Sequence, residues 1–221
     1  MGRRHDLSRR KRVYLLHFAL MSHIDWILFD LGGVLLEVNQ SRVFGRLETL
    51  TDIPASVIGE RLTSAPFFRE QFIVREFSPL EIAEHVNTIL GVRLPTNDIV
   101  GAINAELGAE ISSTASLLPN LRRRTKIGCL SNTNSIHWDQ LLQSYPFMQN
   151  FDRRFASQIL GFAKPGREIY EKAAEYLNAQ PRQILFFDDK MENVETARRL
   201  GWNAHQYVGH EQLLADLARF T

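Results

Sequence analysis

Four short apolar segments, each leading into polar residues, constrain the fold of this chain more than any other feature of its sequence. They are residues 26–29 (WILF), 127–130 (IGCL), 155–157 (FAS) and 184–187 (ILFF). Short apolar runs bounded by turn residues are typical of buried strands in a parallel sheet. Helix-spaced apolar residues fill the intervals, so we predict an α/β fold with a parallel sheet and right-handed crossovers.

Charged or hydrogen-bonding residues follow each of these segments. In chain order they are Asp30, Ser131-Asn132, Lys164 and Asp188-Asp189. Ligands of open α/β sheets bind outside the carboxyl ends of the strands, which is where Asp30 would lie. Taken alone, each motif has an ordinary alternative: a turn aspartate, a helix start, a loop lysine and a helix N-cap. The order of all four motifs is therefore more informative than any one of them.

This order of motifs resembles the fingerprint of the haloacid dehalogenase superfamily of aspartate-nucleophile phosphohydrolases, from Asp30 to about Asn193. The resemblance implies a Rossmann-like parallel sheet with an inserted all-helical cap, a bound Mg²⁺ ion and an aspartyl-phosphate intermediate. It also implies that Asp30 and Lys164 are catalytic. The implied phosphate-binding residues are Ser131, Asn132 and Lys164. The implied metal ligands are Asp30, the main-chain carbonyl of Gly32 and Asp189. Asp188 would bind the metal through water or support the site from an outer position.

The sequence departs from the usual pattern of this superfamily two residues after the predicted nucleophile. Most of its phosphatases have a second aspartate there, which protonates the leaving group and later activates water, whereas this chain has Gly32. A general acid/base contributes roughly 10²- to 10⁴-fold to a rate. The candidates for a substitute are Glu37, in a short flap at residues 34–38, and His137, near the start of the helix after Ser131.

A closer resemblance is to a bacterial subgroup related to α-D-glucose-1-phosphate phosphatase. It is carried by residues 29–34 (FDLGGV), residues 130–134 (LSNTN) with His137, and residues 186–189 (FFDD) with Asn193. That subgroup shares the glycine after the nucleophile and includes active phosphatases. It often has the polar turn Glu-Arg-Gly-Glu-Ile-Ser near the substrate, where this chain has residues 73–78 (IVREFS). The difference weakens the expectation of a glucose phosphate substrate.

The predicted domain organisation follows from a change of pattern after residue 39. Residues 40–116 carry apolar residues at helical spacing, broken by prolines, and residues 78–81 (SPLE) have the features of a helix start. We expect this all-helical block to form a cap, and residues 21–39 and 117–221 to form the α/β core. Residues 1–20 are a basic extension, either disordered or upstream of a true start at Met21, with a signal peptide as the less favoured alternative.

Composition narrows the class of protein. The 221 residues include 26 Lys and Arg against 25 Asp and Glu, so no overall charge favours nucleic acid or an anionic membrane. The single cysteine, Cys129, excludes an intramolecular disulfide, and no apolar run is long enough to span a bilayer. The basic run at residues 122–124 is either a solvated helix face or a phosphate or partner site. We expect a cytoplasmic protein without nucleic-acid or membrane partners, of undetermined oligomeric state.

The sequence thus predicts an Mg²⁺-dependent phosphatase that hydrolyses a small phosphorylated metabolite, for example a sugar phosphate, through an aspartyl-phosphate intermediate. Two alternatives remain. A metal-independent 2-haloacid dehalogenase also uses an aspartate nucleophile and lacks the second aspartate, although the paired carboxylates Asp188 and Asp189 argue against it. A non-catalytic binding or regulatory protein of the same fold would explain Gly32.

Overall fold

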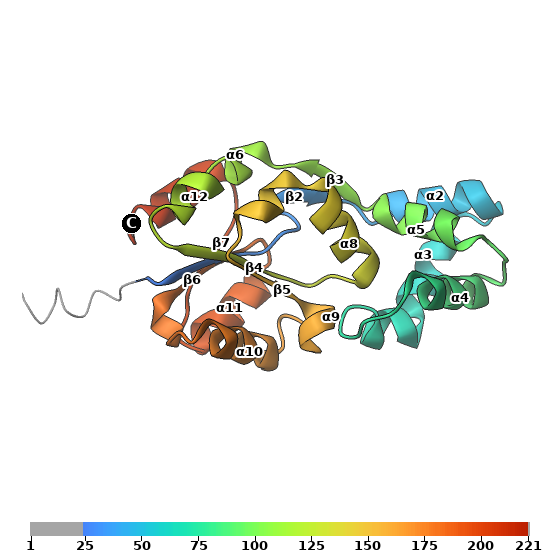
Figure 1. The fold of residues 1–221 in the computed structure, drawn as a ribbon. Helices are drawn as coiled ribbons and strands as arrows, with labels where there is room; N and C mark the ends of the chain where they lie inside the picture. Colours follow the sequence, from blue (N-terminus) through green and yellow to red (C-terminus); the bar gives the residue numbers. More distant parts are fainter. Residues whose placement is uncertain (1–23, 221) are drawn as a thin grey trace, which may run out of the picture.

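The computed structural model describes residues 24–220, so the predicted extension at residues 1–20 lies outside the described residues. Its centre is a five-stranded sheet in the order β5-β4-β1-β6-β7 (Figure 1). The strands are β1 (Trp26–Phe29), β4 (Lys126–Ser131), β5 (Arg153–Ala156), β6 (Ile184–Asp188) and β7 (Asn203–Gln206). All neighbouring pairs are parallel, which confirms the predicted α/β class with a Rossmann-like sheet.

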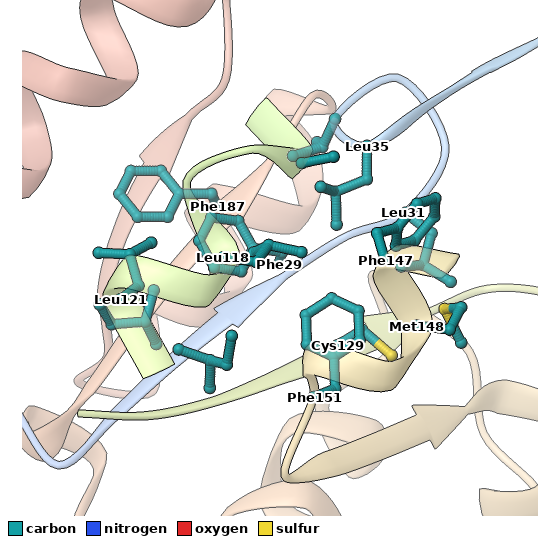
Figure 2. Close-up of a cluster of buried hydrophobic side chains, with 14 of the residues drawn as sticks. Phe29, Leu31, Leu35, Leu118, Leu121, Cys129, Phe147, Met148, Phe151 and Phe187 are labelled. Atoms are coloured by element: carbon teal, nitrogen blue, oxygen red, sulfur yellow. The ribbon is translucent and has the colours of Figure 1, made fainter. Parts of the chain in front are cut away.

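Side chains of the central strand β1 alternate between two apolar clusters, one on each face of the sheet. Ile27 and Phe29 belong to the first cluster, in which the rings of Phe29 and Phe187 stack with their centroids 5.6 Å apart (Figure 2). Trp26 and Leu28 belong to the second cluster. Because both faces of the sheet are covered, β1 is apolar and buried along its whole length, as a parallel strand between two helix layers requires.

Helices cover both faces of the sheet (Figure 1). The face of the first cluster is covered by α7 (Leu118–Arg122), α8 (Ser135–Ser144) and α12 (His210–Leu217), and the opposite face by α10 (Arg167–Leu177) and α11 (Met191–Arg199). The connections contain α6 (Ser112–Ala115), α9 (Ser157–Leu160) and the 3₁₀ turns η2 (Pro146–Asn150) and η3 (Pro181–Gln183). None of the helices in residues 24–220 has both the length and the apolar character that a membrane crossing requires.

Between β1 and β4 the chain forms a second group of helices beyond one end of the sheet (Figure 1), here called the helical unit (residues 41–104). It consists of α2 (Ser41–Thr51), α3 (Ala55–Ser64), the π-helical turn η1 (Phe67–Gln71), α4 (Pro79–Leu90) and α5 (Thr96–Asn104). These helices pack around an apolar cluster of their own, to which Ile136 of α8 contributes. The predicted start of α4 is confirmed, because Ser78 and Glu81 form a capping box.

The end of the segment at residues 40–116 differs from the all-helical expectation. Residues Leu107–Glu110 form strand β3, which pairs antiparallel with β2 (Leu36–Val38). The reason is non-local: β3 is a short strand with glycine and alanine inside it, and its partner lies some seventy residues earlier in the chain. After β3, Ala115 of α6 packs into the first apolar cluster of the sheet. The chain therefore leaves and re-enters the α/β core through a two-stranded ribbon.

Two glycines give a matched test of the packing around the sheet and in the helical unit. A Cβ on Gly128 of β4 would lie 2.6 Å from the Arg153 carbonyl oxygen and 2.8 Å from Leu28 Cδ2, whereas a Cβ on Gly45 of α2 would meet nothing within 4 Å. We expect Gly128→Ala to lower the free energy of unfolding by about 1–3 kcal/mol through overpacking. Gly45→Ala should raise it by about 0.5–1 kcal/mol because alanine favours a helix interior.

Urea unfolding of the two variants beside the wild-type chain measures both effects. Equal slopes against urea concentration would show that the midpoints report stability. A Gly128→Ala variant as stable as the wild-type chain would contradict the tight approach of β4 to β5.

Candidate active site

The strands place their polar ends around one cavity at the carboxyl edge of the sheet. Phe29 of β1 lies level with Cys129 and Phe187 in the neighbouring strands, so the residues that follow these positions emerge together. The cavity has a volume of about 170 Å³. Of the residues predicted from the sequence, its walls include Asp30, Gly32, Ser131, Asn132, His137, Lys164 and Asp189. The topology thus brings together residues that are up to 159 positions apart in the sequence.

Lys164 lies between two carboxylates beneath the cavity. Its Nζ is 2.9 Å from Asp30 Oδ1 and 2.6 Å from Asp188 Oδ2, and its side chain is 1% exposed. Burial opposes the charge of Lys164, but the two carboxylates outweigh it and raise the lysine pKa above its usual range. Burial also raises the pKa of Asp30, to about 6, although Lys164 lowers it. Above pH 6 the structure therefore holds an ionised Asp30 against a protonated lysine.

The side chain of Asn132 fixes the loop that carries Lys164. Its Nδ2 donates to the Lys164 carbonyl oxygen at 2.7 Å, and the Lys164 backbone N–H donates to Asn132 Oδ1 at 2.8 Å. The amide is therefore used within the protein, which leaves the main-chain N–H of Asn132 and the hydroxyl of Ser131 as the donors available to an anion. The following helix α8 begins at Ser135, with Asn134 as its N-cap, and its N-terminus also favours negative charge.

Asp188 is fully buried and both of its oxygens have partners. Oδ2 pairs with Lys164, while Oδ1 accepts from the Lys190 backbone N–H at 2.9 Å and from Asn193 Nδ2 at 2.8 Å. Tyr170 holds Asn193 in turn, because its hydroxyl donates to the Asn193 carbonyl oxygen at 3.0 Å. Asp188 therefore acts on the site by fixing Lys164. The sequence analysis gave Asn193 no role, although its place in the first turn after β6 was an available signal.

Asp189 has a different environment. Its Oδ1 is buried and has no hydrogen-bond partner among residues 24–220. Burial raises its pKa, and the charge of Asp188 adds to this effect. Gly33 has a φ of +74°, and a Cβ there would lie 2.6 Å from Asp189 Oδ2. Only glycine therefore allows the turn after β1 to approach this carboxylate so closely.

The donor set suits a hard cation such as Mg²⁺. Carboxylate oxygens of Asp30, Asp188 and Asp189 lie within 4.8 Å of one another. Asp189 Oδ1 lacks a partner, and no hydrogen bond to Asp30 Oδ2 occurs within the described part of the chain. Mg²⁺ typically takes one or two carboxylates and keeps several waters. Asp30 and Asp189 are thus the carboxylates that fit direct ligands, whereas the oxygens of Asp188 are already used.

The two predicted substitutes for the missing acid/base lie in different places. Glu37 is exposed on β2 and does not line the cavity, although its neighbours Leu36 and Val38 do. His137 lines the cavity, but its Nε2 lies 2.9 Å from the Ile103 carbonyl oxygen, which can only accept a hydrogen bond. Its Nδ1 lies 3.0 Å from Asn134 Nδ2. Burial lowers the pKa of His137, so the ring is neutral and holds α8 against the helical unit.

Glu106 is a cavity residue that the sequence analysis missed. It precedes β3, its Oε2 lies 3.8 Å from His137 Nε2, and it lines both this cavity and a larger neighbouring one. The segment was expected to be helical, which hid the position of this residue. The basic run at residues 122–124 does not reach the site: it lines a hollow with Trp26 and Lys126, at the starts of β1 and β4.

Comparison with protein families and curated proteins gives a consistent result. A model of the haloacid dehalogenase-like hydrolases matches residues 24–201. The chain is 26% identical over 177 residues to a sesquiterpene phosphatase of Aspergillus oryzae, covering 79% of this chain and 85% of that one. It is 22% identical over 186 residues to a D-ribitol-5-phosphate phosphatase of Bacteroides thetaiotaomicron, covering 81% and 90%.

Solved structures agree with the fold. A haloacid dehalogenase family enzyme of Bacteroides thetaiotaomicron, in complex with magnesium and inorganic phosphate, matches with a TM-score of 0.73 and 25% identity, covering 83% of this chain and 93% of that one. An L-2-haloacid dehalogenase of Xanthobacter autotrophicus matches with a TM-score of 0.61 and 18% identity, covering 90% and 84%. At that identity the second match shows a shared fold alone.

Replacing the buried lysine, Lys164, tests the charge balance of the site. In the metal-free chain at pH 8, Lys164→Met should lower the free energy of unfolding by about 3–5 kcal/mol, because two buried carboxylates lose their partner. The deficit should shrink as the pH falls towards 6, because without Lys164 the pKa of Asp30 rises above its wild-type value and protonation then removes one of the opposed charges. Denaturant unfolding across this pH range, with EDTA present, measures both effects.

Lys172→Met is the matched control for this substitution. Lys172 is an exposed lysine whose Nζ lies 3.2 Å from Glu175 Oε2, so its loss should change stability by less than about 1 kcal/mol. A deficit in Lys164→Met that did not vary with pH would indicate lost packing instead of lost charge balance.

Proposed function

This chain belongs to the haloacid dehalogenase-like hydrolase family, and we propose that it is an Mg²⁺-dependent phosphatase that hydrolyses a small phosphorylated metabolite through an aspartyl-phosphate intermediate on Asp30. The observation that carries the proposal is the buried Lys164 between Asp30 and Asp188, beside Asp189 Oδ1, which has no partner among residues 24–220. This arrangement offers a charge-balanced nucleophile next to hard oxygen donors. The phosphatases among its relatives support the same conclusion.

In the proposed reaction the carboxylate of Asp30 attacks phosphorus, and the bond from phosphorus to the leaving oxygen breaks. Lys164 balances the charge at Asp30, while the Ser131 hydroxyl and the Asn132 main-chain N–H donate to the phosphoryl oxygens. Mg²⁺, when bound by Asp30, the Gly32 carbonyl and Asp189, would neutralise negative charge on the phosphate. Water then attacks phosphorus in the acyl phosphate, which releases inorganic phosphate and restores the Asp30 carboxylate.

The leaving oxygen needs a proton, and we assign this role to Glu106. Three carboxylate residues line the catalytic cavity in residues 24–220, and Asp30 and Asp189 serve as nucleophile and metal ligand in the proposal. The usual position of the acid, two residues after the nucleophile, is occupied by Gly32, while Glu37 does not line the cavity. Glu106 is the third of these residues and lies beside the neutral His137.

Several finer expectations from the sequence remain proposals. The helical unit would serve as a cap that excludes water during the reaction. A sugar phosphate remains one candidate substrate, and the ribitol-5-phosphate phosphatase among the relatives supports that class. A cytoplasmic location without nucleic-acid or membrane partners also remains a prediction.

The two alternative functions each have a specific argument against them. A metal-independent dehalogenase has no use for the partly buried carboxylate of Asp189, whose Oδ1 lacks a partner within the described residues. A non-catalytic binding protein has no need for an Asp30 carboxylate that is paired with a buried lysine and lines a cavity. The carboxylates of Asp30 and Asp189 therefore favour the phosphatase over both alternatives.

Phosphate release tests the proposed activity. We expect hydrolysis of p-nitrophenyl phosphate that requires Mg²⁺ and falls at least about 10³-fold in Asp30→Asn, which lacks the nucleophile. Asp189→Asn should abolish the rise in melting temperature caused by Mg²⁺, which is about 3–6 °C at tenfold excess over the dissociation constant. Asp139→Asn, at an exposed position of α8, is the matched control and should change neither readout.

Other outcomes would identify the alternatives. Chloride release from 2-chloropropionate without Mg²⁺ would favour a dehalogenase. Mg²⁺ binding without turnover of any phosphate ester would favour a non-catalytic protein.

The role of Glu106 predicts a dependence on the leaving group. Glu106→Gln should lower kcat for an alkyl phosphate about 10²-fold or more, because an alkoxide needs a proton to leave. The same variant should lower kcat for p-nitrophenyl phosphate less than about threefold, since nitrophenolate leaves without one. Glu110→Gln, on the same ribbon but outside the cavity, is the control. Equal losses for both substrates would instead assign Glu106 a structural role.

A further inference from the structure

A second, larger cavity lies between the helical unit and the catalytic cavity. Its volume is about 300 Å³, within the range of pockets that hold small organic molecules. Most of its walls are apolar and come from the helical unit, including Val43, Leu47, Phe68, Phe72, Ile73 and Val86. We propose that this cavity binds the organic group of the substrate, and that this group is a hydrocarbon chain or ring system. The inference rests on the proposed function and names its substrate class.

The two cavities are neighbours and share part of their walls. Glu106, Asn132, Thr133 and His137 line both of them. In the proposal, a phosphoryl group at Asp30 has its ester oxygen on the side of these shared residues, and the attached organic group occupies the larger cavity. The arrangement fits a phosphate monoester whose charged and apolar ends occupy separate spaces.

The polar groups deep in the larger cavity are already bonded to the protein. The Asn132 side chain is bonded to the backbone of Lys164, and Asn134 is bonded to His137 through both its amide nitrogen and its oxygen. His137 Nε2 is bonded to the Ile103 carbonyl. A sugar or polyol beside these groups would lose hydrogen bonds to water and gain none from them, which is unfavourable, whereas a hydrocarbon loses none. The carboxylate of Glu106, which also lines this cavity, is assigned to the ester oxygen in the proposal.

Three further polar residues of the wall lie towards solvent. Gln40, Thr63 and Arg69 are exposed, and the Thr63 hydroxyl donates to the Gly59 carbonyl oxygen at 2.7 Å. They therefore belong to the mouth of the cavity. Val43, Leu47 and Val86 are buried and form its inner wall. The buried part of the cavity is thus apolar, which suits an apolar group.

A series of n-alkyl phosphates from ethyl to octyl tests the inference. Each methylene buried in an apolar pocket should strengthen binding by up to about fourfold. We therefore expect kcat/KM to rise at least about twofold per methylene until the cavity is filled, and octyl phosphate to exceed glucose and ribitol phosphates at least about 100-fold. A flat series, or a preference for a sugar phosphate, would overturn the inference while leaving the phosphatase intact.

A pair of neighbouring substitutions localises the effect. Ile73 lines the cavity and Val74 does not, and both side chains are half-buried and lie outside the apolar cluster of the helical unit. Ile73→Asp should raise KM for octyl phosphate about tenfold and change KM for ethyl phosphate less than about twofold. Val74→Asp should change neither. If both variants raised KM equally, the larger cavity would not be the binding site.

Binding to Asp30→Asn separates the inference from the proposed reaction. Calorimetric titration of this variant with ethyl and octyl phosphate, in the presence of Mg²⁺, measures affinity without turnover. Tighter binding of octyl phosphate, with no hydrolysis by the wild-type chain, would overturn the proposed function and retain the apolar ligand. Equal affinity for the two esters would overturn the apolar ligand itself.

Discussion

The ion pairs of Lys164 with Asp30 and Asp188 are the interaction on which the rest of this site depends. Two carboxylates at the ends of adjacent strands are costly to bury, and only a cation between them makes the arrangement tolerable. The surrounding structure serves to keep that cation in place. Asn132 accepts a hydrogen bond from the Lys164 backbone N–H, and Asn193 donates one to Asp188. The register of the parallel strands thus places the two carboxylates close together, and the lysine between them makes that placement stable.

The sequence predicted what depends on local pattern. Apolar runs ending in polar residues located the strands, and the order of the polar ends located Asp30 and Lys164 at one edge. It could not predict which side of a short strand faces the cavity. Glu37 was a candidate acid, but its neighbours Leu36 and Val38 line the cavity, since side chains alternate along a strand. Glu106 was missed because the pairing of β3 with β2 joins distant segments.

Gly32 changes how the two parts of the chain depend on each other. When the acid follows the nucleophile by two residues, both belong to the same loop of the core. Here the remaining carboxylate residue of the cavity wall, among residues 24–220, is Glu106, which lies between α5 and β3, where the helical unit returns to the ribbon. His137 connects the same region to α8 through the Ile103 carbonyl. Substrate selection and proton transfer would then depend on the same few contacts between the helical unit and the core.

The β2–β3 ribbon has a consequence for how such a protein diversifies. Val38 and Leu107 are direct partners in the ribbon, so the long insertion between them begins and ends at nearly the same point. A segment whose ends are adjacent can be lengthened, shortened or exchanged without moving the strands on either side. The sheet and its buried charges can therefore stay unchanged during evolution, while the sequence and substrate specificity of the inserted helices change. The ribbon is thus the point at which one inserted unit could replace another, so that the same reaction would act on a different substrate.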